Sequence, residues 1–153
     1  MEENKNIQIR LSEINEISFY LNPIPIPIEQ IEFGKNLNLQ IGFRFNVNQE
    51  KDIFKFYTLV DFTILGHSDP IVGIETEIVF EIPNLSSIVK LESGEQLQIE
   101  NNFLTTLAGV CIGTTRGLLA SNTKGSPIAK FPLPILNPME ILENMNKQPE
   151  VSK

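Results

Sequence analysis

Residues 37–47 read Leu-Asn-Leu-Gln-Ile-Gly-Phe-Arg-Phe-Asn-Val, and their pattern is the strongest structural signal in the chain. All six odd-numbered positions are apolar, whereas the five positions between them are polar or glycine. Successive side chains of a β-strand point to opposite faces of the sheet, so this alternation predicts a strand with one buried and one wet face. Such a division is typical of an antiparallel sheet.

Two segments that follow have the same period, and each is expected to bury its even-numbered residues. The strand predicted over residues 53–65 would bury Phe54, Phe56, Thr58, Val60, Phe62 and Ile64. The strand predicted over residues 72–82 would bury Val72, Ile74, Thr76, Ile78, Phe80 and Ile82. Residues 48–52 and 66–70 have the composition of short turns, so the three strands are predicted to form a meander.

An earlier strand is predicted over residues 7–21, with an interruption. Apolar residues occupy odd positions on both sides of Ile14 and Asn15, which are expected to mark a β-bulge. Residues 22–27 follow, with proline at every second position. Because proline cannot donate a backbone hydrogen bond, this segment is expected to be an extended connection or a sheet edge.

The second half of the chain changes to a helical period. Residues 83–100 are predicted to form a crossover, and residues 101–122 a long helix that ends at Lys124-Gly125. Asn137-Pro138 is predicted to begin a short final helix. The apolar stripe expected on the long helix is Phe103, Leu107, Val110, Cys111, Thr114 and Leu118. Gly109, Gly113 and Gly117 stack on one side of it and predict a close packing partner.

The predicted fold class is therefore α+β, with a four-stranded antiparallel sheet, a long helix packed on one face and a short C-terminal helix. A chain of 153 residues is long enough for one domain with a real core. We assign residues 1–146 to that domain and residues 147–153 to a flexible tail.

Charge and composition exclude several functional classes. The net charge is −7, with 12 basic and 19 acidic residues, so binding to nucleic acid or to an anionic membrane surface is not expected. No apolar run approaches the length of a membrane span, and residues 1–5 lack the features of a signal peptide. A single cysteine excludes an internal disulfide. We expect a cytoplasmic protein without membrane insertion.

The residues that could carry chemistry are few. The single histidine, His67, is placed in a predicted turn, and Cys111 among apolar residues of the helix, so neither a catalytic set nor a metal site is expected. Glu75, Glu77 and Glu81 share one face of a predicted strand, where a solvated face or a docking patch is a better interpretation than a catalytic pair. We therefore expect no enzyme and no cofactor.

The order of these elements resembles the SecB export chaperones and their divergent SecB-like relatives, over about residues 5–145. Ile17-Ser18-Phe19, a proline-bearing break and a long alternating strand are similar to the family's first crossover. The helix that ends at Lys124-Gly125, followed by Leu133-Pro134-Ile135 and a short helix, is similar to the family's C-terminal half.

The resemblance implies an ATP-independent chaperone that binds unfolded or newly made polypeptides, in protein export or as the guard of one client such as an antitoxin. It implies a homo-oligomer, a dimer or a tetramer, in which the three glycines would pack helix against helix. It also implies long apolar grooves for the client. By position, the candidate groove walls are Leu85, Ile88, Val89, Leu91, Leu118 and Phe131.

Export SecB docks the SecA motor ATPase through acidic residues on the outer face of its sheet. Glu75, Glu77 and Glu81 would supply an acidic outer face here, although they do not fall clearly on the family's docking positions. The acidic motor-binding tail has no counterpart in residues 146–153. Two alternatives remain open: a non-catalytic interaction subunit with one specific protein partner, and an enzyme or ligand binder with a cavity under the sheet.

Overall fold

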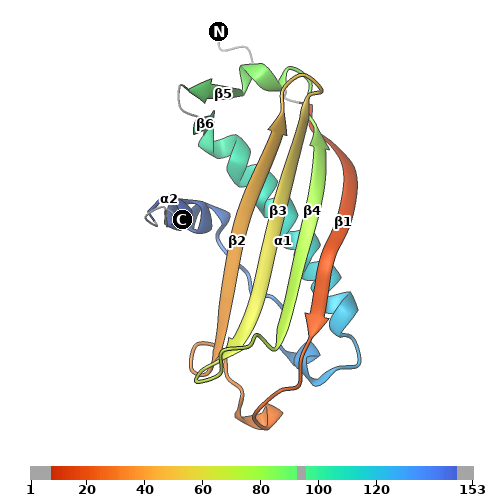
Figure 1. Ribbon diagram of the computed structural model, residues 1–153, viewed down its shortest axis with the longest axis vertical. Helices are drawn as coiled ribbons and strands as arrows, with labels where there is room; N and C mark the ends of the chain where they lie inside the picture. Colours follow the sequence, from red (N-terminus) through yellow and green to blue (C-terminus); the bar gives the residue numbers. More distant parts are fainter. Residues whose placement is uncertain (1–7, 93–95, 148–153) are drawn as a thin grey trace.

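The computed structural model describes residues 8–92 and 96–147. The chain forms a four-stranded antiparallel sheet, a long helix behind it and a short C-terminal helix, which confirms the predicted fold class (Figure 1). In chain order the elements are β1 (Arg10–Leu21), η1 (Ile28–Gln30), β2 (Leu37–Asn48), β3 (Ile53–Ile64), β4 (Val72–Glu81), η2 (Leu85–Ser87), β5 (Val89–Glu92), β6 (Gln96–Ile99), α1 (Asn101–Thr123), η3 (Pro127–Lys130) and α2 (Pro138–Lys147).

The sheet has the order β1-β4-β3-β2, so β1 and β2 are its two edges. The meander predicted for the second to fourth strands is confirmed, because β2 pairs with β3 and β3 pairs with β4. The β2–β3 ladder runs without a register shift from Leu37 opposite Ile64 to Asn48 opposite Ile53. Asp52 lies in the left-handed region in the tight turn between them, with a φ of 56°.

The inner face of the sheet forms the core with α1, which crosses diagonally behind the central strands (Figure 1). The even-numbered residues of β3 point toward α1, as the alternation predicts, and all six are at most 1% exposed. Each fully buried Phe or Ile contributes about 1.5–3 kcal/mol relative to its exposed state. Phe54 meets Phe103 of α1 edge to face, with ring centroids 6.3 Å apart.

The apolar stripe of α1 is rotated from the predicted one. Phe103, Leu107 and Cys111 are buried as expected, but Val110 is 41% exposed. Thr115, rather than Thr114, faces the core, and its hydroxyl lies 2.8 Å from that of Thr76 on β4. The prediction was wrong here because Thr115 is buried together with Thr76 and extends the buried stripe of the helix. A hydropathy pattern does not identify such a threonine, since it can be buried only when its hydroxyl has a hydrogen-bond partner.

Strand β1 contains two bulges, where a single bulge at Ile14 and Asn15 was expected. The register with β4 shifts between Leu11 and Glu13 and again between Glu16 and Ser18. Ile14 itself stays in the ladder, opposite Ile78. The predicted position was wrong because each bulge adds one residue to β1, one before Ile14 and one after it. The inner face therefore changes from odd-numbered to even-numbered residues at the first bulge and back to odd-numbered residues at the second.

The crossover predicted over residues 83–100 contains a feature that the sequence did not indicate. Strands β5 and β6 pair as a small antiparallel hairpin, with Val89 opposite Ile99. Gln49 ties the hairpin to the main sheet, because its side-chain amide donates to the backbone oxygen of Val89 over 2.8 Å. Residues 148–153, most of the predicted flexible tail, lie outside the described residues, and Lys147 belongs to α2.

Helix α1 is long and apolar enough to cross a bilayer by length and composition alone, over Asn102–Thr123. This corrects the expectation that no apolar run approaches that length. The helix packs one face against β3 and β4, and a core helix of this kind satisfies the same two criteria. The end of α1 is as predicted, since Gly125 follows it with a φ of 84°.

Candidate binding site

A cleft of about 570 Å³ lies between the edge strand β2 and helix α2. One wall is the continuous stretch Leu39 to Phe43, and the other is made by Ile141, Asn144 and Met145 of α2. Gln40 and Gly42 belong to the outer face of the sheet, yet both line the cleft. The cleft therefore runs along the free edge of β2 and exposes the strand's backbone as well as its inner side chains.

The hydrogen bonds next to the start of β2 show which backbone groups face that edge. Asn36 accepts from Leu65 on the β3 side, whereas the amide of Leu37 donates to Glu32 and its oxygen accepts from Gly34. Because the direction alternates along an antiparallel ladder, the odd-numbered residues of β2 point their N–H and C=O groups away from β3. Within the described chain, no backbone partner occupies these groups from Leu39 to Val47.

The chain itself already pairs with the first position of this edge. Phe33 forms an isolated parallel bridge with Leu37, so the segment before β2 folds back and covers the beginning of the strand. The ring of Phe33 packs edge to face against Phe62, at a centroid distance of 5.5 Å. A local turn thus covers the first position of the β2 edge, and the edge is open from Leu39 onward.

The side chains in the cleft are suited to an uncharged polypeptide segment, because hydrophobic residues lie beside the neutral amides of Gln40 and Asn144. None of the eight lining residues carries a charge. Leu39, Ile41, Ile141 and Met145 are half-buried hydrophobic residues that pack against the core and leave part of their surface open. Covering such surface stabilises a complex by about 25 cal/mol per Å² of apolar area.

The six residues predicted to line a client groove are not among the residues of this cleft, and they do not all lie in one place. Leu85 and Val89 are fully buried beside the β2–β3 turn, where the Leu85 amide donates to Asp52, and Ile88 between them is half-buried. Phe131 lies at the other end of the sheet, against Phe33, with ring centroids 5.7 Å apart.

The two remaining candidates add no wall to the cleft. Leu118 is half-buried on α1, and the side chain of Leu91 lies outside the described residues. Contact of these six residues with a client stays a prediction.

The predicted acidic face is on the outer side of the sheet, and its central carboxylate is tightly held. Glu77 accepts hydrogen bonds from Tyr57 over 2.6 Å and from Asn15 over 3.0 Å. These two donors lower the pKa of Glu77, with the Tyr57 bond as the larger cause. Glu75 pairs with Arg44 over 3.2 Å, and the Arg44 guanidinium lies over the Tyr57 ring. The two neighbouring carboxylates therefore do not form a proton-sharing pair.

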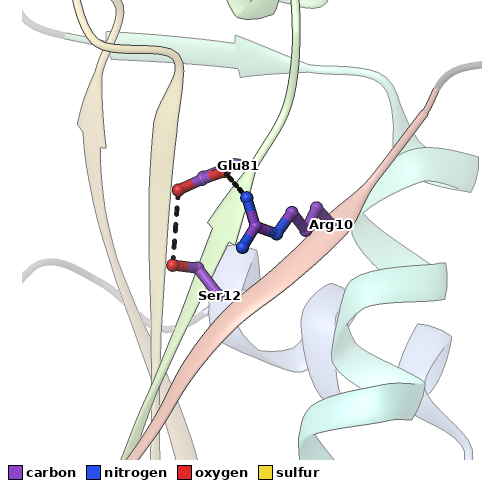
Figure 2. A network of polar contacts seen from close by, with 3 residues as sticks. All are labelled: Arg10, Ser12 and Glu81. Atoms are coloured by element: carbon purple, nitrogen blue, oxygen red, sulfur yellow. Dashed lines mark hydrogen bonds and ion pairs between the residues drawn. The ribbon is translucent and has the colours of Figure 1, made fainter.

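Glu81, the third acidic residue, bonds to β1 at the first bulge (Figure 2). One of its oxygens accepts from Arg10 over 3.2 Å and the other from Ser12 over 3.4 Å. The contact joins residues on both sides of Leu11, where β1 changes register. Docking of a partner to Glu75, Glu77 and Glu81 stays a prediction.

The predicted glycine stripe is on the exposed side of α1. Gly109, Gly113 and Gly117 are all exposed, and a Cβ built at Gly113 or Gly117 would meet no atom within 4 Å. Only Gly109 has a neighbour, the Cγ of Pro138 at 3.9 Å from its built Cβ. Within the described chain nothing packs closely on the other two glycines, so the partner expected for this stripe stays a prediction.

The residues that could have carried chemistry lie apart from one another. Cys111 is fully buried, and desolvation raises the pKa of its thiol, as expected for a core residue. His67 is exposed in the β3–β4 turn. Among the described residues no group of three or more His, Cys, Asp or Glu side chains could hold a metal ion.

Comparison with solved structures supports the fold assignment. The chain is similar to the Mycobacterium tuberculosis Rv1957 SecB-like chaperone, solved in complex with a ChAD peptide from the Rv1956 HigA1 antitoxin. The TM-score is 0.55 at 15% identity, over 84% of this chain and 89% of that one. The chain therefore has a SecB-like fold.

The other comparisons add little. A protein of unknown function from Streptococcus agalactiae matches with a TM-score of 0.45 and 13% identity, over 85% of this chain and 97% of that chain. No protein-family model matches the sequence, and no curated protein matches it.

Sequence reasoning missed the cleft, although it identified both of its walls as elements. The residues 37–47 were predicted as a strand and residues from Pro138 as a helix. The pattern gave no sign that β2 is an edge or that α2 returns beside it. The charges favoured the opposite prediction, because residues 37–48 contain only Arg44, and edge strands usually carry more charge than this.

Proposed function

We propose that this protein is a non-catalytic, chaperone-like binder of extended polypeptide segments and that the cleft beside β2 is its client site. The observation that carries the proposal is the uncharged cleft along an unpaired strand edge, lined by hydrophobic side chains together with neutral polar groups. An unfolded chain supplies the two complementary features, free backbone hydrogen-bonding groups and apolar side chains. A folded protein surface seldom exposes both together.

The SecB-like neighbour supports this proposal, because it was solved with a peptide from an antitoxin. Peptide binding by a protein of the same fold makes polypeptide the first ligand to test here. A dedicated antitoxin-like client and a broad set of unfolded clients are both compatible with the cleft, since neither its size nor its lining selects a single sequence.

The proposed mode of binding is strand addition. The client would pair with the outward backbone groups of Leu39, Ile41 and Phe43 and place alternate side chains toward Ile141 and Met145. The unpaired edge of β2 from Leu39 onward supports this mode. Main-chain hydrogen bonds would give affinity with little sequence preference, and the apolar lining would select against charged segments.

Substitution of Ile41 by Asp tests the site directly. A carboxylate in the apolar cleft must be desolvated when a client binds, so we expect the Kd of a fluorescent apolar peptide of about nine residues to rise at least tenfold. The Kd is measured by fluorescence anisotropy, and circular dichroism checks that the variant has the same fold as the parent. Leu65→Asp is the matched control, because Leu65 is 65% exposed in the turn after β3 and does not line the cleft.

Equal affinity of Ile41→Asp and the parent protein for the peptide would contradict the assignment of the site. Suppression of aggregation by a chemically unfolded protein, followed by light scattering, separates the two forms of the proposal. A general chaperone suppresses aggregation of unrelated clients, whereas an interaction subunit with one partner does not and retains one stoichiometric partner in a pull-down.

We also propose self-association, because apolar side chains are exposed along the other edge of the sheet. Five large hydrophobic residues of the edge strand β1 and the residue before it are between 37% and 50% exposed: Ile9, Leu11, Ile14, Ile17 and Leu21. Exposed apolar residues gathered along one strand are typical of an interface. The exposed glycine stripe of α1 adds a second surface on which a copy of the helix could approach closely.

Protein export, docking of the SecA motor and a cytoplasmic location belong to the proposal as extensions of the SecB-like fold. The outer acidic face of Glu75, Glu77 and Glu81 is the surface on which motor docking would be tested. An enzyme is the weakest alternative, because Glu75 and Glu77 lie on the outer sheet face and engage Arg44 and Tyr57 rather than lining a cavity.

A further inference from the structure

Arg116 makes a contact that neither charge pairing nor core packing explains. From the half-buried side of α1 its guanidinium donates to two successive backbone oxygens, Nε to Leu133 over 2.9 Å and Nη2 to Pro134 over 2.7 Å. None of the described ion pairs includes Arg116. The fork geometry of a guanidinium suits two acceptors side by side, so Arg116 helps to orient this piece of chain, which the buried side chain of Leu133 also anchors to the core.

The segment held by Arg116 leads directly into α2. Residues 131–137 form neither helix nor strand, and Pro132 and Pro134 remove two of the amides that could have held them. Two turns earlier on α1, about 10 Å away, Gly109 lies beside Pro138, the first residue of α2. The segment thus runs antiparallel to α1, from the hydrogen bonds at Arg116 to the contact at Gly109.

The position of α2 depends strongly on this attachment. The helix has ten residues, and its inner side chains Ile141, Leu142 and Met145 are only half-buried. Its first turn is capped by Asn137, whose side-chain oxygen accepts from the amide of Met139 over 3.0 Å. These half-buried side chains pack against the core, and the attachment before the first residue of the helix adds to that packing in positioning it.

We propose that Arg116 is a positioning residue for the client cleft: by holding the chain before α2, it sets the separation between α2 and the edge of β2. The inference rests on the proposed function, since it assigns a role within the same cleft. The described hydrogen bonds of Arg116 go to Leu133 and Pro134, neither of which lines the cleft, so Arg116 acts through the Leu133–Pro138 segment.

The test measures the cleft itself rather than binding alone. Spin labels at Asn38→Cys on β2 and Glu143→Cys on α2 report the distance across the cleft by pulsed electron paramagnetic resonance. Both positions are exposed, and the native Cys111 is buried away from the label. Labelled chain is diluted with unlabelled chain so that only distances within one chain contribute. The variants are Arg116→Met and Arg116→Lys, with Arg10→Met as the matched control, because Arg10 is an exposed residue whose described contacts are with Glu81.

We expect a narrow distance distribution in the parent and in Arg10→Met, and a broadened one in Arg116→Met. Lysine has one donor group and reaches one carbonyl, so Arg116→Lys should be intermediate. The Kd of the apolar peptide should rise about tenfold in Arg116→Met, since two charge-assisted hydrogen bonds no longer hold the helix. If Arg116→Met does not fold, Arg116→Lys decides through the same two measurements.

A distance distribution in the folded Arg116 variants as narrow as in the parent overturns the positioning role, whatever happens to affinity. A broadened distribution, with no peptide binding by the parent itself, overturns the proposed function while the positioning role stands. A broadened distribution with binding unchanged shows that the cleft width does not matter for the ligand, and this also overturns the inference.

Discussion

The two edges of the sheet are built differently. Strand β2 pairs with β3 over its whole length without a register shift, carries a single charged residue and lines a cleft. Strand β1 has two bulges, carries Arg10, Glu13 and Glu16, and exposes its apolar side chains to the outside. Both strands have 12 residues, so length does not distinguish them.

The difference indicates what each edge can bind. Bulges and charges interrupt the regular row of backbone donors and acceptors, which is how sheet edges avoid uncontrolled pairing. Strand β1 is guarded in this way and offers side chains, a surface suited to a complementary folded partner such as a second copy. Strand β2 is unguarded and offers its backbone, a surface suited to an extended chain.

The largest effect is expected from a charge on the β1 edge. Ile14 is 48% exposed and lies opposite Ile78, so it is directed to the inner side of the sheet. Ile14→Asp should weaken self-association about a hundredfold, roughly 3 kcal/mol, because a carboxylate would be desolvated at the proposed interface. Sedimentation velocity over a range of concentrations gives the association constant.

The matched comparison is Ile41→Asp on β2, which should leave self-association unchanged while it weakens peptide binding. Ile14→Asp should do the reverse. If Ile14→Asp and Ile41→Asp are both folded and each loses self-association as well as peptide binding, the two edges are not separate surfaces.

A smaller effect is expected where β1 joins β4. The ring of Tyr20 lies across Gly73, and a Cβ at that position would overlap the ring. Gly73→Ala should therefore lower the free energy of unfolding by about 2–3 kcal/mol, because Tyr20 must move and its hydrogen bond to Asp61 is lost. Urea denaturation followed by circular dichroism measures the change.

Gly42 on β2 provides the control for the same substitution. A Cβ there meets no atom within 4 Å, so Gly42→Ala should change the free energy of unfolding by no more than about 0.5 kcal/mol. Equal losses at the two positions would mean that the substitution itself, rather than contact with Tyr20, destabilises the sheet.

The smallest effect concerns the hydrogen bond from Tyr20 to Asp61, 2.6 Å long. Burial and this bond raise the pKa of Tyr20 from 10.0 to about 12. The folded state therefore favours the neutral phenol, and its stabilising contribution is complete below pH 10 and lost as the pH rises through about 12. Tyr20→Phe should cost about 1 kcal/mol at neutral pH and remove this alkaline dependence.

Tyrosinate absorbance in a Tyr57→Phe background isolates this group, since the chain has only two tyrosines. A titration midpoint near 10.0 in the folded protein would show that the contact between β1 and β3 is not formed in solution.

Much of the fold could be predicted from local sequence patterns. The alternation of residues 37–47 and the even-numbered apolar residues after Phe54 predicted strands whose inner faces the structure confirms, because side-chain period two follows from backbone geometry alone. The long helix was predicted within one residue of its ends, and Gly125 ends it as expected. The hairpin of β5 and β6 was missed because strands of four residues are too short to show a period.

The candidate site could not be predicted in the same way. The groove residues proposed by position divide between the two ends of the sheet, with Val89 beside the β2–β3 turn and Phe131 beside Phe33. The cleft instead joins β2 to a helix about a hundred residues later in the chain, through contacts that no local pattern encodes.

Period, turn residues and helix caps were enough to specify the four strands of the main sheet, the two α-helices and the acidic outer face, because each depends on residues a few positions apart. Which strands became edges, which of them was left unpaired, and how Arg116 brings α2 beside β2 were decided only in three dimensions. These properties depend on the packing of distant segments against one core, and the free energy of that packing cannot be inferred from any single stretch of the sequence.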